Sequence, residues 1–188
     1  MKRKRILLGI LILVGIVAFL GSAQFGYSQG NPAMQEKIVP CKQCACWKIV
    51  SMTAKPNCYK VLPCQEKDFV FSFTVDFQAV PKTLTPCNLV IGSSSKTCQY
   101  ESSTQPPLDL SGVPVGGSVT FAWPGPGDTV VVTRPNSHHI RLYVPKYYVS
   151  CRCDGRTPVT ITVTAHSMCG KREMCKADTK TLTVPPCK

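Results

Sequence analysis

Twelve cysteines occur in this chain of 188 residues, and every one of them lies beyond residue 40. The chain starts with the basic tract Lys2–Arg5, which is followed by the uncharged apolar run Ile6–Leu20. A basic start, a short apolar run and small residues after it are typical of a secretory signal peptide. We therefore expect a signal peptide, forming a helix, over residues 1–28, or alternatively a retained membrane anchor, and an exported domain over residues 29–188.

Export determines how the cysteines are interpreted. Oxidising compartments preserve disulfides that cytosolic thiols would reduce, and an even number of cysteines in an exported chain is typical of a disulfide framework. The sequence therefore predicts that all twelve form structural disulfides: Cys41, Cys44, Cys46, Cys58, Cys64, Cys87, Cys98, Cys151, Cys153, Cys169, Cys175 and Cys187. Three pairs flank short loops and are candidates for local bridges: Cys58 with Cys64, Cys87 with Cys98, and Cys169 with Cys175.

The clustered cysteines leave two hypotheses open. Cys44 and Cys46 are two residues apart, as are Cys151 and Cys153, so in a strand each pair would share one face. The two pairs could then cross-link the N-terminal segment to a strand near residue 150. Alternatively, these four residues and Cys41 could offer thiolates to zinc or copper(I). Because about a hundred residues separate the clusters and no βαβ pattern supports a catalytic dithiol, we favour disulfides and expect no cofactor.

The segment DFVFSFTVDFQAV, Asp68–Val80, alternates between apolar and polar residues. This period of two predicts a strand with one face in a core and the other toward water. The apolar face is formed by Phe69, Phe71, Phe73, Val75, Phe77 and Ala79. The opposite face is formed by Ser72, Thr74, Asp76 and Gln78.

The same alternation recurs in GSVTFAW, HHIRLYV and TPVTITVTA, and no window after the signal segment has helical periodicity. Clusters of turn-forming residues separate the strands, at 80–82, 92–95, 124–128 and 134–136. The sequence therefore predicts an all-β chain, folded as an antiparallel β-sandwich stapled by disulfides. The segment Glu101–Gly117 is either a linker between two small β units or a long crossover loop, and we favour one domain.

The C-terminal half combines a Trp-bearing strand, a Gly/Asp turn and Val/Thr-alternating strands, in GSVTFAWPGPGDTVVV, TPVTITVTA and KTLTVPPC. In this respect residues 112–188 resemble bacterial extracellular immunoglobulin-like and PKD-type domains. The chain has Trp123 and the pair Gly127-Asp128 but lacks the full WDFGDG core of a PKD repeat. The resemblance implies an immunoglobulin-like β-sandwich with a role in adhesion, spacing or surface assembly, and it identifies no ligand.

The charge of the exported part is positive. Removing the four N-terminal basic residues from the 22 in the chain leaves 18 against 10 acidic residues, which favours anionic partners. Four cations surround the loop between Cys169 and Cys175 and form the candidate anion-binding site: Lys171, Arg172, Lys176 and Lys180. We expect an anionic envelope polymer or another surface protein as the partner, no intracellular nucleic acid, and membrane contact only through the N-terminal segment.

No catalytic pattern occurs in the sequence. It lacks a G-x-S-x-G elbow and an H-E-x-x-H motif, and Asp76 has no adjacent carboxylate. His166, Met168 and Cys169 stand in the wrong order for a blue-copper site, while consecutive histidines at the start of a strand should face opposite ways. We therefore expect a non-enzymatic structural, adhesion or surface-binding module of a bacterial cell envelope. The alternative is a periplasmic thiolate protein that binds zinc or copper.

Overall fold

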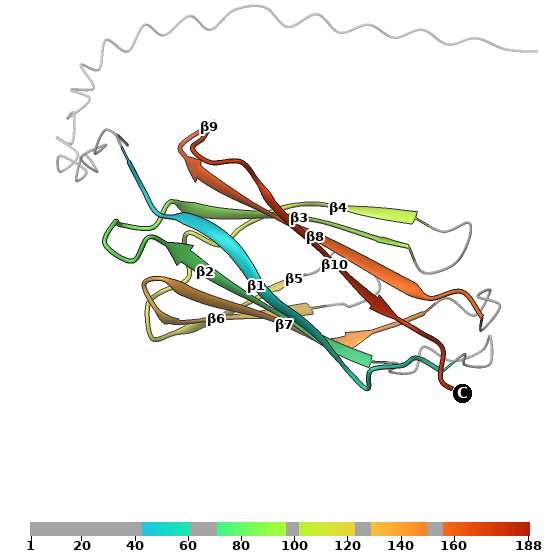
Figure 1. Cartoon of the computed structure of the whole chain (residues 1–188). Coiled ribbons are helices and arrows are strands. Elements are labelled where there is room, and N and C mark those ends of the chain that lie inside the picture. Colours follow the sequence, from blue (N-terminus) through green and yellow to red (C-terminus); the bar gives the residue numbers. More distant parts are fainter. Residues whose placement is uncertain (1–42, 61–70, 97–101, 123–128, 150–155) are drawn as a thin grey trace, which may run out of the picture. The chain divides into compact units, whose positions relative to one another are not determined.

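The computed structural model describes residues 43–60, 71–96, 102–122, 129–149 and 156–188, which form ten β-strands and no helix (Figure 1). The signal peptide expected over residues 1–28 lies outside these residues. Within the described ranges, no helix is long and apolar enough to span a bilayer. All the described strands belong to one unit of the chain, Pro40–Lys188. The prediction of an all-β chain is thus confirmed.

The strands form two antiparallel sheets. The first sheet has the order β1-β2-β7-β6-β5, formed by β1 (Cys46–Lys55), β2 (Phe71–Val80), β7 (His139–Tyr147), β6 (Thr129–Asn136) and β5 (Ser118–Ala122). The second sheet has the order β10-β8-β3-β4, formed by β10 (Asp178–Val184), β8 (Val159–Cys169), β3 (Asn88–Lys96) and β4 (Ser102–Asp109). The short β9 (Arg172–Glu173) pairs with β8.

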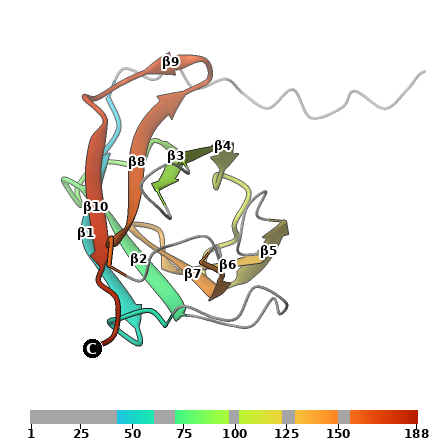
Figure 2. The ribbon, with the colours of Figure 1, turned by 90° about the vertical axis from the view of Figure 1, so that its right-hand side faces the viewer.

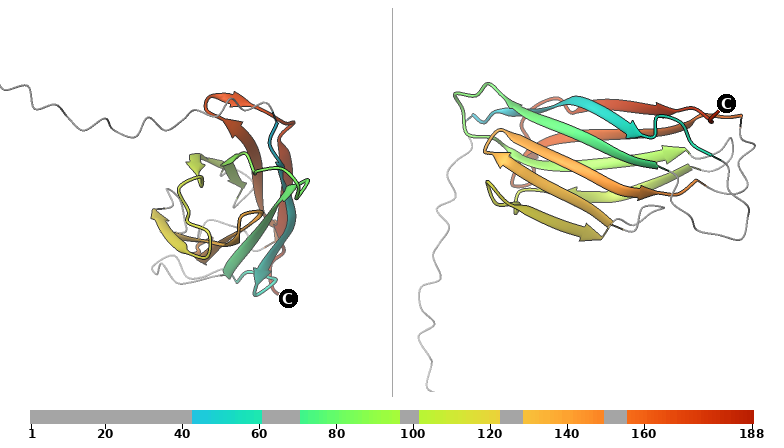
Figure 3. Two further views of the ribbon diagram at one scale, coloured as in Figure 1. Left: turned by 90° about the vertical axis from the view of Figure 1, so that its left-hand side faces the viewer. Right: turned by 90° about the horizontal axis from the view of Figure 1, so that it is seen from below.

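The two sheets face each other across one apolar core (Figures 2 and 3). The predicted apolar face of β2 is fully buried from Phe71 to Ala79, while Phe69 lies outside the described residues. The alternating apolar residues of β7 and β8 are buried as well, as their period of two predicts. The polar face of β2 is not fully exposed as expected: Ser72 is buried, and Thr74, Asp76 and Gln78 are half-buried, since β1 and β7 flank the strand on both sides.

Several segments expected as turns or linkers contain strand residues, and one of them, Arg134–Asn136, forms the end of β6. Gly92–Ser95 was expected to be a turn because of its composition, but it lies within β3, where Ser93 and Ser95 point inward. The first half of the segment 101–117 forms β4, which pairs with β3, and the loop after it buries Leu110 and Val113 in the core. Prolines are tolerated in β4 because it is the edge strand of its sheet.

The disulfides join segments that are distant in sequence. Cys44 is bonded to Cys87, Cys46 to Cys175 and Cys58 to Cys187, and Cys169 is also disulfide-bonded. The three local bridges expected from loop length are therefore wrong, as is the cross-link of Cys44 and Cys46 to the pair near residue 150. The reason is geometric. Folding of the sheets brings together cysteines that are 43 or 129 residues apart in the sequence, and these distant partners form the bonds instead of the cysteines at the two ends of a short loop. The remaining cysteines, Cys41, Cys64, Cys98, Cys151 and Cys153, lie outside the described residues.

Candidate functional site

The edge strands β1 and β10 lie side by side, and we call this junction the seam (Figure 2). Along the seam, three residues in or just after β1 have a neighbour 129 positions later in the sequence. This separation holds for Cys46 with Cys175, for Cys58 with Cys187, and for Ile49 with Asp178. The two strands therefore run in the same direction, with a disulfide at each end of the seam. The other edges, β4 and β5, lie on the opposite side (Figures 2 and 3).

Side chains satisfy three of the backbone groups of β1 along the seam. The Trp47 N–H donates to Ser167 Oγ at 2.8 Å, and the Ile49 N–H donates to Asp178 Oδ2 at 2.7 Å. In the opposite direction, Lys180 Nζ donates to the Val50 carbonyl at 3.1 Å. Unpaired backbone groups on an edge strand invite pairing with another chain. The seam therefore closes this side of the molecule without a continuous hydrogen-bond ladder.

The hairpin between β8 and β10 projects next to one end of the seam (Figure 1). Its turn is made by Gly170, whose φ of 57° is readily adopted only by glycine. Lys171, Arg172 and Lys176 follow. They are exposed, and none of their side chains has a hydrogen bond or ion pair within the part of the chain that the structure describes. We call residues 170–176 the cationic hairpin. The bridge from Cys175 to Cys46 ties its base to the start of β1.

Lys180 differs from the other three predicted cations. It lies on β10, two residues before Leu182, and reaches across the seam to the Val50 carbonyl. The structure therefore brings Lys171, Arg172 and Lys176 together on one hairpin and places Lys180 beside β1. Sequence reasoning missed Lys48 on β1, whose ammonium lies 3.6 Å from Asp178.

The two carboxylates of this region are already engaged. Glu173 Oε1 lies 2.8 Å from His166 Nδ1, and Asp178 interacts with both Ile49 and Lys48. The cations outnumber them: Lys48, Lys171, Arg172, Lys176 and Lys180. Among the described residues, the exposed end of the hairpin therefore carries more positive charge than the single carboxylate of Glu173 can neutralise.

A second polar cluster lies on the outer face of the first sheet, around Asp76 on β2. Its Oδ1 accepts hydrogen bonds from Arg141 Nε at 2.8 Å and from His139 Nε2 at 3.0 Å, and its Oδ2 accepts one from Ser51 Oγ at 3.0 Å. Burial alone would raise the pKa of Asp76, but the bonds from Arg141, His139 and Ser51 together hold it below the ordinary value.

This cluster contains a serine, a histidine and an aspartate but does not have the geometry of a catalytic triad. In a triad the histidine contacts the serine and removes its proton. Here Ser51 donates directly to the carboxylate, and His139 contacts the same carboxylate rather than the serine. The arrangement stabilises the Asp76 carboxylate instead of activating a nucleophile. The alternating polar residues of β2 and β7 were visible in the sequence, but their pairing depends on register.

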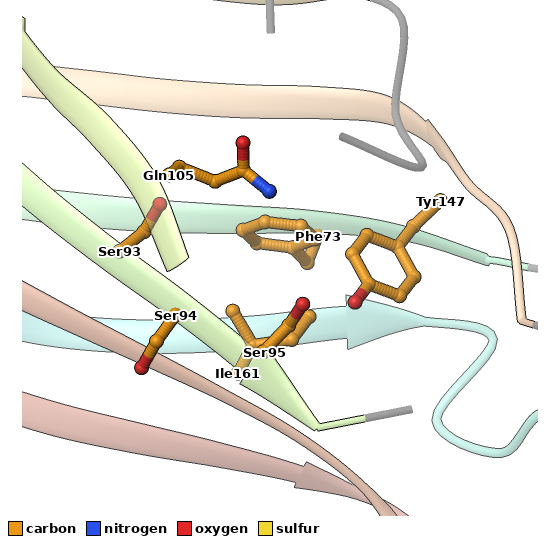
Figure 4. A pocket seen from close by; sticks show the side chains of 7 residues that line it. All are labelled: Phe73, Ser93, Ser94, Ser95, Gln105, Tyr147 and Ile161. Atoms are coloured by element: carbon orange, nitrogen blue, oxygen red, sulfur yellow. The ribbon is translucent and has the colours of Figure 1, made fainter. Parts of the chain in front are cut away.

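A small cavity lies between the sheets (Figure 4). It is lined by Phe73, Ser93, Ser94, Ser95, Gln105, Tyr147 and Ile161. Burial raises the pKa of Tyr147 to about 12, although the neighbouring Ser95 hydroxyl partly offsets this effect. Among the described residues, the Tyr147 hydroxyl has no partner in full hydrogen-bond geometry. The cavity measures about 10 Å³, which suits a single water molecule and is far below the size of an organic ligand site.

Two of the cysteines that the metal-binding hypothesis needs as thiolate ligands form disulfides instead. Cys44 and Cys46 are bonded to other cysteines, so neither can supply a thiolate while those bridges are intact. In the ranges that the structure describes, no group of three or more His, Cys, Asp or Glu side chains is placed to hold a metal ion.

Comparison of the chain with protein-family models, with curated proteins and with solved structures finds no match. The function is therefore inferred from the residues themselves.

Proposed function

We propose that this protein is an exported, non-enzymatic module of the cell envelope that binds an anionic polymer through the cationic hairpin. The observation that carries the proposal is the set of three exposed cations, Lys171, Arg172 and Lys176, which lack protein partners among the described residues. Structural disulfides are typical of oxidising compartments and support export. The two facing antiparallel sheets support an immunoglobulin-like sandwich, the fold implied by the resemblance of residues 112–188.

The anchoring of the hairpin favours binding. The Cys46–Cys175 bridge and the pairing of β9 with β8 hold the backbone beside the cations in one conformation. A preorganised loop loses less conformational freedom when it binds, so more of the electrostatic attraction contributes to affinity. Because exposed charges are screened over about 8–10 Å at moderate salt, binding should weaken as the salt concentration rises.

The proposal is tested by charge reversal in the purified exported protein. We expect the variant Lys171→Glu/Arg172→Glu to bind dextran sulfate about tenfold more weakly at low salt, and with a smaller dependence on salt, since about 1.4 kcal/mol corresponds to a factor of ten. The matched control is Lys96→Glu/Lys188→Glu, which changes the net charge equally at exposed positions outside the hairpin. Equal losses in both variants would show that net charge, and not the hairpin, governs binding.

A further inference from the structure

One aromatic side chain is exposed among the described residues. Tyr143 on β7 is 40% exposed, whereas the other described aromatic residues are buried or half-buried. The tyrosine faces outward because its neighbours in sequence, Leu142 and Val144, point into the core. Its hydroxyl has no hydrogen bond to another described residue. Singly exposed apolar side chains are normal on protein surfaces, so the exposure of Tyr143 alone identifies no site, and its neighbours decide what the ring can bind.

The neighbours of Tyr143 leave its ring accessible. Across the sheet it lies opposite Thr74 on β2 and Val131 on β6, both of which are shorter side chains. In the adjacent row, Arg141 lies opposite Asp76 and Thr133. The ring therefore stands above a surface of small side chains and has Arg141 two residues away on the same strand face. That spacing corresponds to about 7 Å along a strand.

Arg141 has hydrogen-bond donors that no described residue uses. Its side chain is 52% exposed, and only Nε is used, in the 2.8 Å bond to Asp76. Within the described part of the chain, the two terminal nitrogens, Nη1 and Nη2, have no partner. A guanidinium presents these nitrogens as a planar fork that matches a carboxylate. The bond to Asp76 fixes the orientation of that fork beside Tyr143.

Most of the charge on this face is already paired among the described residues. Asp76 accepts a hydrogen bond from Arg141, and Lys48 on β1 lies 3.6 Å from Asp178. The side chain of Lys55, exposed at the end of β1, has no partner in the described part of the chain, so the face keeps a small positive charge. A ligand for this face therefore needs a negative group for Arg141 and an apolar surface for the tyrosine ring.

We propose that the Tyr143 face, defined by Thr74, Val131, Arg141 and Tyr143, binds a linear polysaccharide of uronic acids. The C–H face of one sugar ring stacks on Tyr143, and a sugar carboxylate lies in the fork formed by Nη1 and Nη2 of Arg141. The unused Nη1 and Nη2 donors of Arg141 select a carboxylated chain over a neutral one. The face shares no residue with the cationic hairpin, so this site is independent of the function proposed for the hairpin.

The test measures binding of oligogalacturonate to the exported protein by calorimetry. We expect Tyr143→Ala to weaken binding about tenfold and Tyr143→Phe to leave it within about twofold, because the ring and not the hydroxyl provides the stacking surface. Arg141→Lys keeps the charge but lacks the fork, so it should also weaken binding several-fold. Thr181→Ala, an exposed threonine on the other sheet, is the control that should bind normally.

The ligand comparison is made in the Lys171→Glu/Arg172→Glu background, because the cationic hairpin would also prefer the charged ligand. Fully methyl-esterified oligogalacturonate has the same rings without charge, and we expect it to bind at least about tenfold more weakly than the acid. Equal binding of the acid and its ester would overturn the role of Arg141, and unchanged binding by Tyr143→Ala would overturn the site. Tighter, Tyr143-dependent binding of single-stranded DNA would also overturn the proposal in favour of nucleic acid. The hairpin variant Lys171→Glu/Arg172→Glu leaves this face intact. Adding Tyr143→Ala to that variant should therefore still weaken binding of oligogalacturonate about tenfold.

Discussion

The carboxylate of Asp178 on β10 accepts the backbone N–H of Ile49 on β1 at 2.7 Å, so one side chain joins the edges of the two sheets. The second oxygen of the same carboxylate lies 3.6 Å from the ammonium of Lys48. Asp178 thus accepts a backbone hydrogen bond that a neighbouring strand would otherwise accept, and it also neutralises the charge of Lys48. The seam depends on side chains as well as on the disulfides at its two ends.

The first prediction concerns this contact. Asp178→Ala leaves the Ile49 N–H without an acceptor, and an unsatisfied, partly buried donor costs about 1–3 kcal/mol in the free energy of unfolding. Asp178→Asn keeps a carbonyl oxygen for the same bond and should cost less. Urea unfolding of both variants, with exposed Thr183→Ala on the same strand as the control, measures the difference. If Asp178→Ala and Thr183→Ala were equally stable, the contact would contribute nothing to the fold.

The second prediction compares the two faces of β2. Phe73 is fully buried and contacts the Tyr147 ring edge-to-face, with 5.8 Å between the centroids, whereas Thr74 is half-buried on the outer face. Phe73→Ala should lower the free energy of unfolding by about 3–5 kcal/mol, and Thr74→Ala by less than about 1 kcal/mol. Equal destabilisation in urea unfolding would mean that both faces of the strand are buried.

The buried faces of β2, β7 and β8 could be predicted because alternation is a local property of each strand. Which strands become neighbours is a property of the whole chain, and the disulfides depend on it. Cys169 and Cys175 are only six residues apart, yet Cys175 is bonded to Cys46, 129 residues away. Loop length favours short bridges, but the folded sheet brings the start of β1 next to the base of the hairpin.

The cationic hairpin could be predicted in part from the same alternation of apolar and polar residues. Lys171 and Arg172 stand between two alternating segments and are exposed at a turn, as their position predicts. Lys180 is spaced by two residues from Leu182 and by four from Val184, so the strand pattern places its side chain on the same face as theirs rather than among the hairpin cations. Asp76 had no visible partner in the sequence, because the partners are supplied by β1 and β7 through the register of pairing.

The third prediction concerns the two disulfides that end the seam. While Cys58–Cys187 is intact, the Cys46–Cys175 bridge closes a loop of only about 25 residues, which runs from Cys46 to Cys58, across the other bridge, and from Cys187 back to Cys175. The same loop is closed by Cys58–Cys187 while Cys46–Cys175 is intact, so the loss of either bridge alone should lower the free energy of unfolding by about 3 kcal/mol. Losing both releases the chain across a separation of 129 residues. The double loss should therefore exceed the sum of the two single losses by about 1–2 kcal/mol, from the logarithmic dependence on loop length.

Paired Cys→Ser variants, unfolded in urea, measure this coupling. The control is loss of Cys44–Cys87, which lies outside the seam and closes a separation of 43 residues. Strict additivity of the two seam bridges would argue against their closing one shared loop.

The fourth prediction concerns the Tyr147 hydroxyl, which lies in the small cavity without a full hydrogen bond to a described residue. Tyr147→Phe removes this hydroxyl and keeps the ring contacts with Phe71 and Phe73. The change in the free energy of unfolding should therefore be below about 1 kcal/mol, whereas Tyr147→Ala should cost about 3–5 kcal/mol. A loss of about 2 kcal/mol or more in Tyr147→Phe would show that the hydroxyl is well hydrogen-bonded, for example to a water in the cavity.

The last prediction concerns the dependence of stability on pH. The pKa of Asp76 in the folded protein lies below its ordinary value of about 3.9, since the bonds from Arg141, His139 and Ser51 favour the charged carboxylate. A carboxyl group with a lowered folded pKa contributes stability that is complete above the unfolded pKa and is lost as the pH falls through the folded pKa. Asp76→Asn should therefore be less stable than the natural protein at pH 7.

The difference between Asp76→Asn and the natural protein should narrow as the pH falls from about 4 toward 2, because the natural protein loses the contribution that the variant never had. Urea unfolding at pH 7, 4 and 2 follows this narrowing. Gln78→Ala changes a neutral residue on the same face of β2, so its difference from the natural protein should stay constant over the same range. A constant difference for Asp76→Asn as well would mean that the three hydrogen bonds do not favour the charged form of the carboxyl group in the folded protein.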